Sequence, residues 1–220
     1  MCRFLRIRSL WYVLLASLSA TSFATHLTNA VHLHSVNQVR ELLMRGATVN
    51  EPEILGPKRE NPLKIALHCY SKNRVSVEAR EDYRKIIDFL LDNGADVNEY
   101  YPQPGVINYS ILYLAIETYD SDLVTKLLKR GMGPDIIVYD FFADHHHHTL
   151  SINHALSRYN SCMDANKLED ATQLRLIIEA LVDANASCKV DPRYLQNTSD
   201  RMREYLRSVE CQIIPYPTRS

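Results

Sequence analysis

Apolar residues in three segments of this chain recur at the spacing of an α-helix. The stripes are Tyr83, Ile86, Ile87, Leu90 and Leu91, then Leu123, Val124, Leu127 and Leu128, and then Leu174, Ile177, Ile178, Leu181 and Val182. The spacing i, i+3, i+4, i+7 predicts a helix that buries one face. A single pair of helices cannot bury such a stripe alone, so we expect neighbouring pairs to stack.

Each stripe ends in a related phrase, and a further copy lies upstream. The copies are Leu42–Asn50, Leu90–Asn98, Leu127–Asp135 and, more faintly, Leu181–Cys188. In each one a pair of apolar residues is followed by Gly or Asn, which predicts a helix that ends in the left-handed conformation. The first three copies recur at roughly 37–48 residues, a period that indicates an array of stacked helical units.

A second short pattern precedes each phrase and centres on an alanine. Its copies are Thr25–Val31 around Ala30, Asn61–Leu67 around Ala66, Ser110–Ile116 around Ala115 and Leu150–Leu156 around Ala155. Together the two patterns resemble the ankyrin repeat, in which T-P-L-H-x-A opens the first of two antiparallel helices. The resemblance covers about Thr25 to Lys189.

The resemblance implies an all-α ankyrin-repeat solenoid of about four helix-turn-helix repeats with extended loops between them. The repeats would span about 25–57, 58–106, 107–146 and 147–189, within a domain over 25–190. The array is divergent, because Thr28, Lys64, Tyr113 and Asn153 occupy the position of the motif histidine. Copies two and four also hold about 12 and 14 extra residues between their helices, which we expect to extend helices or form loops.

The end of the chain, residues 191–220, is predicted to be a capping helix and a tail. Thr198-Ser199-Asp200 is a helix-start signal, and the helix should run to about Glu210. Its apolar face would hold Met202, Tyr205, Leu206 and Val209. An array needs such a terminal unit to cover its last apolar face.

The amino terminus has the pattern of a secretory signal peptide over residues 1–24. Arg3, Arg6 and Arg8 precede the apolar run 10–20, and small residues flank a cut after Ala24. The run is shorter than the about 20 residues that a transmembrane helix needs. The sequence therefore predicts a periplasmic or secreted protein with no membrane attachment after cleavage. An uncleaved membrane anchor and an apolar capping helix remain alternatives.

Export would leave Cys69, Cys162, Cys188 and Cys211 in an oxidising compartment. Four cysteines allow two disulfides in three pairings. Cys188 follows the last repeat's helix end and Cys211 follows the terminal helix, so Cys188–Cys211 is the preferred pair. The alternative is that all four are buried free thiols.

The surface that binds a partner is predicted in the connections between repeats. The formal net charge of −1 gives no basic excess for nucleic acid. In ankyrin arrays these connections form projecting fingers that contact other proteins. Aromatic residues anchor interfaces well, and those in the connections are Tyr100, Tyr101, Tyr139, Phe141 and Phe142. In the alternative, Phe141 and Phe142, with Ile136 and Ile137, pack back onto the array, and the tyrosines could do the same.

Catalytic and metal chemistry are not predicted. The run His145–His148 can bind metal weakly, but a structural site needs four ligands at fixed spacing, and adjacent loop histidines diverge. Ser151, His154 and Asp140 could be imagined as a triad, yet Ser151 and His154 share one short helix and no nucleophile motif is present. The sequence therefore predicts no enzyme, no cofactor and no metal.

The predicted function is protein–protein interaction, by an exported ankyrin-repeat protein that acts as an adaptor or an inhibitor-like partner. One alternative is a secreted pathogen effector that engages a host protein. The other is a periplasmic metal-binding or redox-protective protein that uses the histidine run and the thiols.

Overall fold

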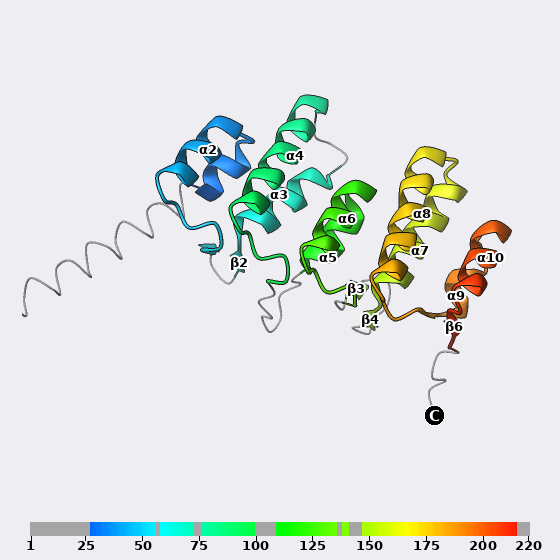
Figure 1. Cartoon of the computed structure of the whole chain (residues 1–220). Coiled ribbons are helices and arrows are strands. Elements are labelled where there is room, and N and C mark those ends of the chain that lie inside the picture. Colours follow the sequence, from blue (N-terminus) through cyan, green and yellow to red (C-terminus); the bar gives the residue numbers. More distant parts are fainter. Residues whose placement is uncertain are drawn as a thin grey trace, which may run out of the picture. The chain divides into compact units, whose positions relative to one another are not determined.

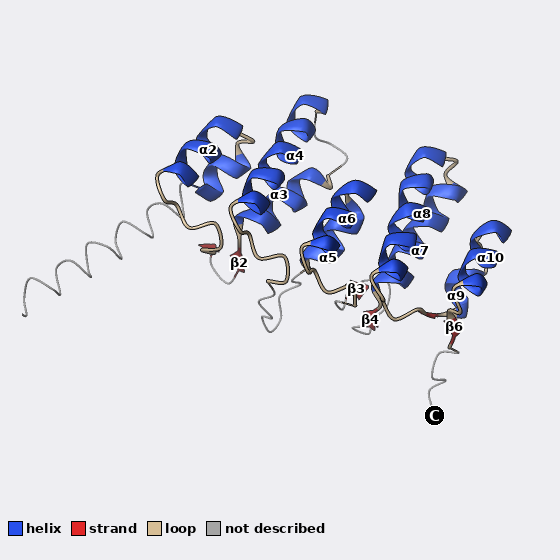
Figure 2. Ribbon diagram, viewed as in Figure 1, coloured by secondary structure: helices blue, strands red, loops and turns tan. Residues whose placement is uncertain are grey.

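A computed structural model describes residues 27–55, 58–72, 76–99, 109–135, 138–140 and 147–214. At 53–55, 58–60, 138–140 and 147–149 it describes the backbone alone. The described chain is mainly α-helical, as predicted (Figure 1, Figure 2). The predicted signal segment 1–24 lies outside the described residues. None of the helices that the structure describes is both long and apolar enough to span a bilayer. The chain divides into two compact units, 1–96 and 97–220, and each is described separately.

Unit 1 holds two helical hairpins joined by a short β-hairpin. Its elements are a helical stretch at 27–32, α2 (Val36–Met44), β1 (Glu53–Leu55), β2 (Lys58–Glu60), α3 (Pro62–Tyr70) and α4 (Val77–Asp92). Helix α3 begins with Pro at its first position, where no backbone donor is lost, and the Asn61 side chain accepts a hydrogen bond from Lys64 N at 2.7 Å. Ser76 caps α4 in the same way, through Ala79 N at 3.2 Å.

Unit 2 continues the hairpin pattern and ends in a smaller helical pair. Its elements are α5 (Ile111–Glu117), α6 (Ser121–Lys129), β3 (Val138–Asp140), β4 (His147–Thr149), α7 (Ser151–Asp164), α8 (Leu168–Asp183), β5 (Lys189–Val190), α9 (Pro192–Leu195), α10 (Asp200–Ser208) and β6 (Gln212–Ile213). Helices α7 and α8 are joined by a short turn and lie side by side, and α8 also packs against α6 (Figure 1).

The predicted apolar stripes lie in the cores of both units, except that Leu128 and Val182 are half-buried. Ile86, Ile87 and Leu90 are fully buried in unit 1, and Leu127 and Leu174 are fully buried in unit 2. Burying one such side chain contributes about 1.5–3 kcal/mol. The first helices add buried residues of the same kind, such as Leu63 and Leu112. The extra residues of copies two and four lengthen helices: α4 and α8 have 16 residues each, whereas α2 and α6 have 9.

Short strands occur where the sequence predicted loops. β1 pairs with β2 and β3 with β4, both antiparallel, while β5 pairs with β6 in parallel. Helical periodicity does not reveal strands of two or three residues. The Gly56-Pro57 dipeptide between β1 and β2 is a turn signal that would have identified the first hairpin.

Candidate functional site

The four repeated phrases end their helices with one common geometry. After α4, Ala95 N donates to Leu90 O at 3.0 Å and Gly94 N donates to Leu91 O at 3.2 Å. The same pair of bonds closes α2, α6 and α8. The residue at the turn is left-handed in every copy, with φ +89° at Gly46, +85° at Gly94, +87° at Gly131 and +61° at Asn185. The predicted helix ends are therefore confirmed.

Four residues after the turn, an amide side chain reaches another helix end in the same unit. In unit 1 Asn50 Nδ2 donates to Gly94 O at 3.0 Å, and Asn50 Oδ1 accepts from Asp96 N at 2.8 Å. In unit 2 Asn98 makes the same two bonds, to Gly131 O and from Gly133 N, both at 2.8 Å. Each amide therefore satisfies a donor and an acceptor that the helix end leaves open.

Asp135 occupies the equivalent position in the next copy. One of its carboxylate oxygens accepts from Ser187 N at 2.7 Å. A carboxylate has no proton to donate, so Asp135 cannot provide the second bond that Asn50 and Asn98 make. These bridges fix where the chain leaves each helix end, and β3 begins three residues after Asp135.

A charged cluster joins the first helices of the two hairpins in unit 2. Glu117 of α5 accepts from His154 Nε2 of α7 at 2.8 Å and from Arg158 at two points, Nε to Oε1 at 2.6 Å and Nη2 to Oε2 at 2.9 Å. Glu117 is mostly buried, with a side chain 18% exposed, and His154 is nearly fully buried. The fork of Arg158 and the carboxylate match in geometry, so the pair clamps α5 to α7.

Aromatic rings extend this cluster toward the start of α5. Tyr109 stacks on Tyr113 with ring centres 4.5 Å apart, and Tyr113 lies 4.7 Å from the His154 ring. Tyr113 and Glu117 are four residues apart and share one face of α5, and His154 and Arg158 are spaced likewise on α7. Tyr109 lies just before the N-cap of α5. Tyr109 and Tyr113 remain half-exposed, which leaves an aromatic edge beside the ion pair.

Burial and charge oppose each other in this cluster. Burial alone would raise the pKa of Glu117, but the hydrogen bonds and charges of His154 and Arg158 hold it below its ordinary value. Burial, with the Glu117 charge as a smaller cause, raises the pKa of Tyr113 to about 12. The same causes raise the pKa of Tyr119 to about 12. The carboxylate is therefore ionised and both phenols are neutral at physiological pH.

Polar side chains of α7 hold the C-terminal segment. Asn153 Nδ2 donates to Lys189 O at 3.0 Å, and Asn153 Oδ1 accepts from Asp191 N at 3.2 Å. About two turns further along α7, Asn160 Nδ2 donates to Tyr194 O at 2.6 Å, and the Tyr159 hydroxyl lies 2.8 Å from Ser199 Oγ. Ser199 in turn caps α10, the helix that the sequence predicted there.

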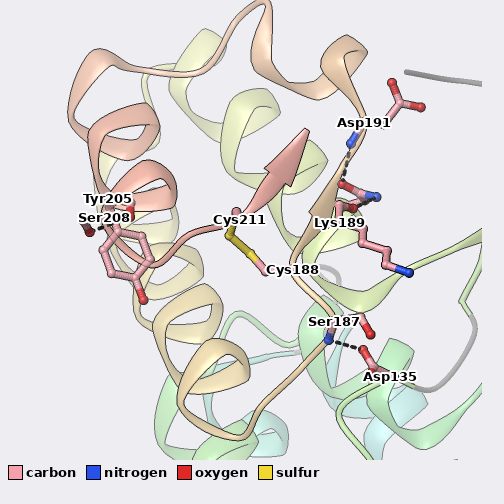
Figure 3. Close-up of a disulfide and its surroundings, with 9 residues drawn as sticks. Asp135, Ser187, Cys188, Lys189, Asp191, Tyr205, Ser208 and Cys211 are labelled. Atoms are coloured by element: carbon pink, nitrogen blue, oxygen red, sulfur yellow. Dashed lines mark hydrogen bonds between the residues drawn. A yellow bond between two sulfur atoms is a disulfide. The ribbon is translucent and has the colours of Figure 1, made fainter. Parts of the chain in front are cut away.

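A disulfide between Cys188 and Cys211 closes the same segment (Figure 3). The two Cα atoms are 4.7 Å apart. Cys188 immediately precedes β5 and Cys211 immediately precedes β6, the two strands that pair. Gln212 N donates to Cys188 O at 2.8 Å, and Ile214 N donates to Val190 O at 3.1 Å. Cys69 and Cys162 are free thiols, half-buried and buried respectively.

Of the five aromatic residues predicted to bind a partner, the structure describes only Tyr139, and only its backbone. Tyr100, Tyr101, Phe141 and Phe142 lie outside the described residues. Tyr139 lies in β3, where its Cα faces that of His148 in β4. The side chain of Tyr139 is not described, so the partner-binding role of these five residues stays a prediction.

The histidines and the imagined triad have these positions. His145 and His146 lie outside the described residues, while His147 and His148 form part of β4. Among the residues that the structure describes, no group of three or more His, Cys, Asp or Glu is placed to hold a metal. The Ser151 hydroxyl donates to Pro134 O, and His154 is bonded to Glu117, so these two side chains serve separate contacts.

Sequence reasoning missed Glu117 and Arg158 as a pair, and the bridging role of Asn50, Asn98 and Asp135. A signal for the bridges was present, because each lies four residues after the left-handed residue.

Comparison with models of known protein families gave no match, and no curated protein matched the sequence.

Proposed function

We propose that this chain is an exported ankyrin-type solenoid that binds another protein through the connections between its repeats. One observation carries the proposal: the same helix end, with the same amide bridge to another helix end, occurs within unit 1 at Asn50 and within unit 2 at Asn98. Recurrent units of this kind build arrays, and arrays act by presenting surfaces.

The cysteine pairing supports export. The Cys188–Cys211 disulfide is typical of an oxidising compartment, which agrees with the signal peptide predicted over 1–24. We infer a periplasmic or secreted location for the mature protein.

The proposed partner is a protein, and the proposed role is that of an adaptor or inhibitor rather than an enzyme. Near-neutral net charge gives no attraction to nucleic acid. The anchors are the aromatic residues of the fingers, Tyr100, Tyr101, Tyr139, Phe141 and Phe142. Large rings lose little conformational entropy on binding, so a few of them can dominate an interface.

The test is crosslinking of the full chain in its native envelope or culture fluid, followed by purification and mass spectrometry. The variant Tyr100→Ala with Tyr101→Ala should lose a partner that the wild type captures. The matched control is Leu33→Ala with Met44→Ala, which removes two exposed apolar side chains outside the fingers. Equal capture by the finger variant and the wild type would refute the finger surface, and partner loss in the control alone would relocate it.

A further inference from the structure

A groove runs between α6 and α8 in unit 2, where the second helices of two hairpins meet. Its volume is about 610 Å³ and it is open to solvent along one side. Leu128 of α6, Leu176 and Ala180 of α8, and Ala184 at the end of α8 give it an apolar floor. These four side chains are half-buried, so apolar surface remains uncovered between the helices.

Acidic residues line the rim of this groove. They are Asp122 of α6 and Glu179 and Asp183 of α8, against the single lysine Lys129 in the lining. Glu179 pairs with Arg175 one turn earlier on α8. Asp122 and Asp183 are exposed and make no ion pair with the described part of the chain, so their charges remain available to a partner.

Two of these carboxylates, Glu179 and Asp183, also affect a tyrosine on the neighbouring helix α10. The pKa of Tyr205 on α10 is raised, first by burial and then by the charges of Glu179 and Asp183, while Arg175 acts in the opposite direction. In the groove lining itself, three carboxylates stand against one lysine. A cationic partner would be attracted to this lining, and an anionic one repelled.

The walls of the groove favour a helix over an extended strand. Both walls are helices, whose backbone donors along their length are already bonded within the helix. An extended peptide would therefore find no main-chain partners here, unlike at a sheet edge. A guest helix can place its side-chain ridge between those of α6 and α8, and the small residues Ala180 and Ala184 permit close approach.

We propose that the α6–α8 groove binds an amphipathic, cationic helix of a partner protein. Apolar side chains of the guest would lie on Leu128 and Leu176, and Lys or Arg beside them would meet Asp122 and Asp183. This rests on the proposed protein-binding function, but it assigns a surface separate from the finger aromatics.

Fluorescence anisotropy with the full mature chain tests the proposal. The probe is a labelled synthetic helix of about 14 residues, built from Leu on one face and Lys on the other, and long enough to form helix on binding. A peptide with Glu in place of Lys is the charge control. The Lys peptide should bind saturably and the Glu peptide should not; binding of both or of neither would overturn the proposal.

Variants locate the binding. Asp122→Asn with Asp183→Asn should weaken the Lys peptide about fivefold, as expected for two exposed ion pairs. Asp164→Asn with Glu204→Gln removes the same charge from exposed positions outside the groove, and should leave affinity within about twofold. Equal weakening by both pairs would show general attraction to an acidic protein and would overturn the groove assignment. Circular dichroism and thermal melting establish that both pairs remain folded.

Photo-crosslinking supplies a readout that does not depend on charge. A benzophenone on the apolar face of the Lys peptide should label residues within 121–129 and 176–184, and labelling confined to other segments would overturn the proposal. Tyr100→Ala with Tyr101→Ala should leave peptide binding unchanged. Failure of the finger surface and failure of the groove are thus separate outcomes.

Discussion

Asn98 joins its own segment to the end of α6, because its side-chain amide donates to Gly131 O and accepts from Gly133 N, both at 2.8 Å. Replacing Asn98 with Ala removes both bonds and leaves two exposed backbone groups to water. We expect the free energy of unfolding to fall by about 1 kcal/mol. Urea denaturation at fixed temperature would measure it. Asn98→Asp, which keeps the acceptor and loses the donor, should fall between the wild type and Asn98→Ala, and an unchanged midpoint in Asn98→Ala would contradict the bridge.

The equivalent position, Asp135, offers a stabilising change. Its carboxylate accepts from Ser187 N but has no proton to give, whereas the asparagines donate to the carbonyl of the left-handed residue. Asp135→Asn should add a bond to Asn185 O and raise the free energy of unfolding by about 0.5–1 kcal/mol. Chemical denaturation would detect the gain. Glu204→Gln removes a charge from the exposed face of α10 and should give no such gain; equal effects would mean that net charge is the cause.

The Glu117 cluster makes stability depend on pH. Because His154 and Arg158 lower the pKa of Glu117 in the folded state, protonation favours the unfolded chain. The contribution is complete above the ordinary value of 4.5 and is lost as pH falls through the lower folded pKa. Glu117→Gln should lower the free energy of unfolding by about 1–3 kcal/mol at neutral pH, since it leaves buried His154 and half-buried Arg158 without their carboxylate.

The difference in unfolding free energy between wild type and Glu117→Gln should become smaller as pH falls below about 4. Urea denaturation across a pH series would follow it. Glu179→Gln, which breaks an ion pair on the surface of one helix, should cost at most about 0.5 kcal/mol at neutral pH. A gap for Glu117→Gln that stays constant with pH would show that the carboxylate acts through packing alone.

The disulfide should contribute measurably to the stability of the C-terminal segment. It joins residues separated by 23 positions, and closing such a loop in the unfolded chain stabilises the fold by about 3 kcal/mol. Cys188→Ser with Cys211→Ser should lower the free energy of unfolding by that amount. A reductant should lower the unfolding free energy of the wild type by a similar amount and leave that of the double variant unchanged. Peptide mapping without reduction should recover Cys188 and Cys211 in one linked product, and free thiols at both would contradict the pairing.

The helices and their ends were predictable because their causes are local. Leu90 and Leu91 mark a buried stripe, and Gly94 supplies the left-handed residue that ends it. Each signal lies within one helix length, so no knowledge of the tertiary fold was needed. The sequence does not decide whether the extra residues of copies two and four extend helices or form loops, because polar residues such as Lys167 suit a loop and a helix start equally.

The tertiary contacts of the candidate site were not predictable in the same way. Glu117 and Arg158 are 41 positions apart, and nothing in either helix specifies which residue of the other it will meet. The Asn98 bridge spans 33 positions and ends on backbone atoms, which carry no sequence identity. Four cysteines allow three pairings, and Cys188–Cys211 was preferred only because both residues follow helix ends. The acidic groove between α6 and α8 needed the packing of those helices before Asp122 and Asp183 could be compared.

Gly131 tests whether the left-handed helix end matters in itself. Its φ is +87°, and a Cβ added there would meet no atom within 4 Å, so substitution costs backbone conformation and not space. Gly131→Ala should lose about 1 kcal/mol of unfolding free energy, because alanine disfavours this conformation. Gly131→Asn should lose less, since asparagine tolerates it and Asn185 holds φ +61° at the equivalent position. Thermal and urea denaturation of both variants would rank them, and an alanine variant as stable as the wild type would mean that the helix end can relax without cost.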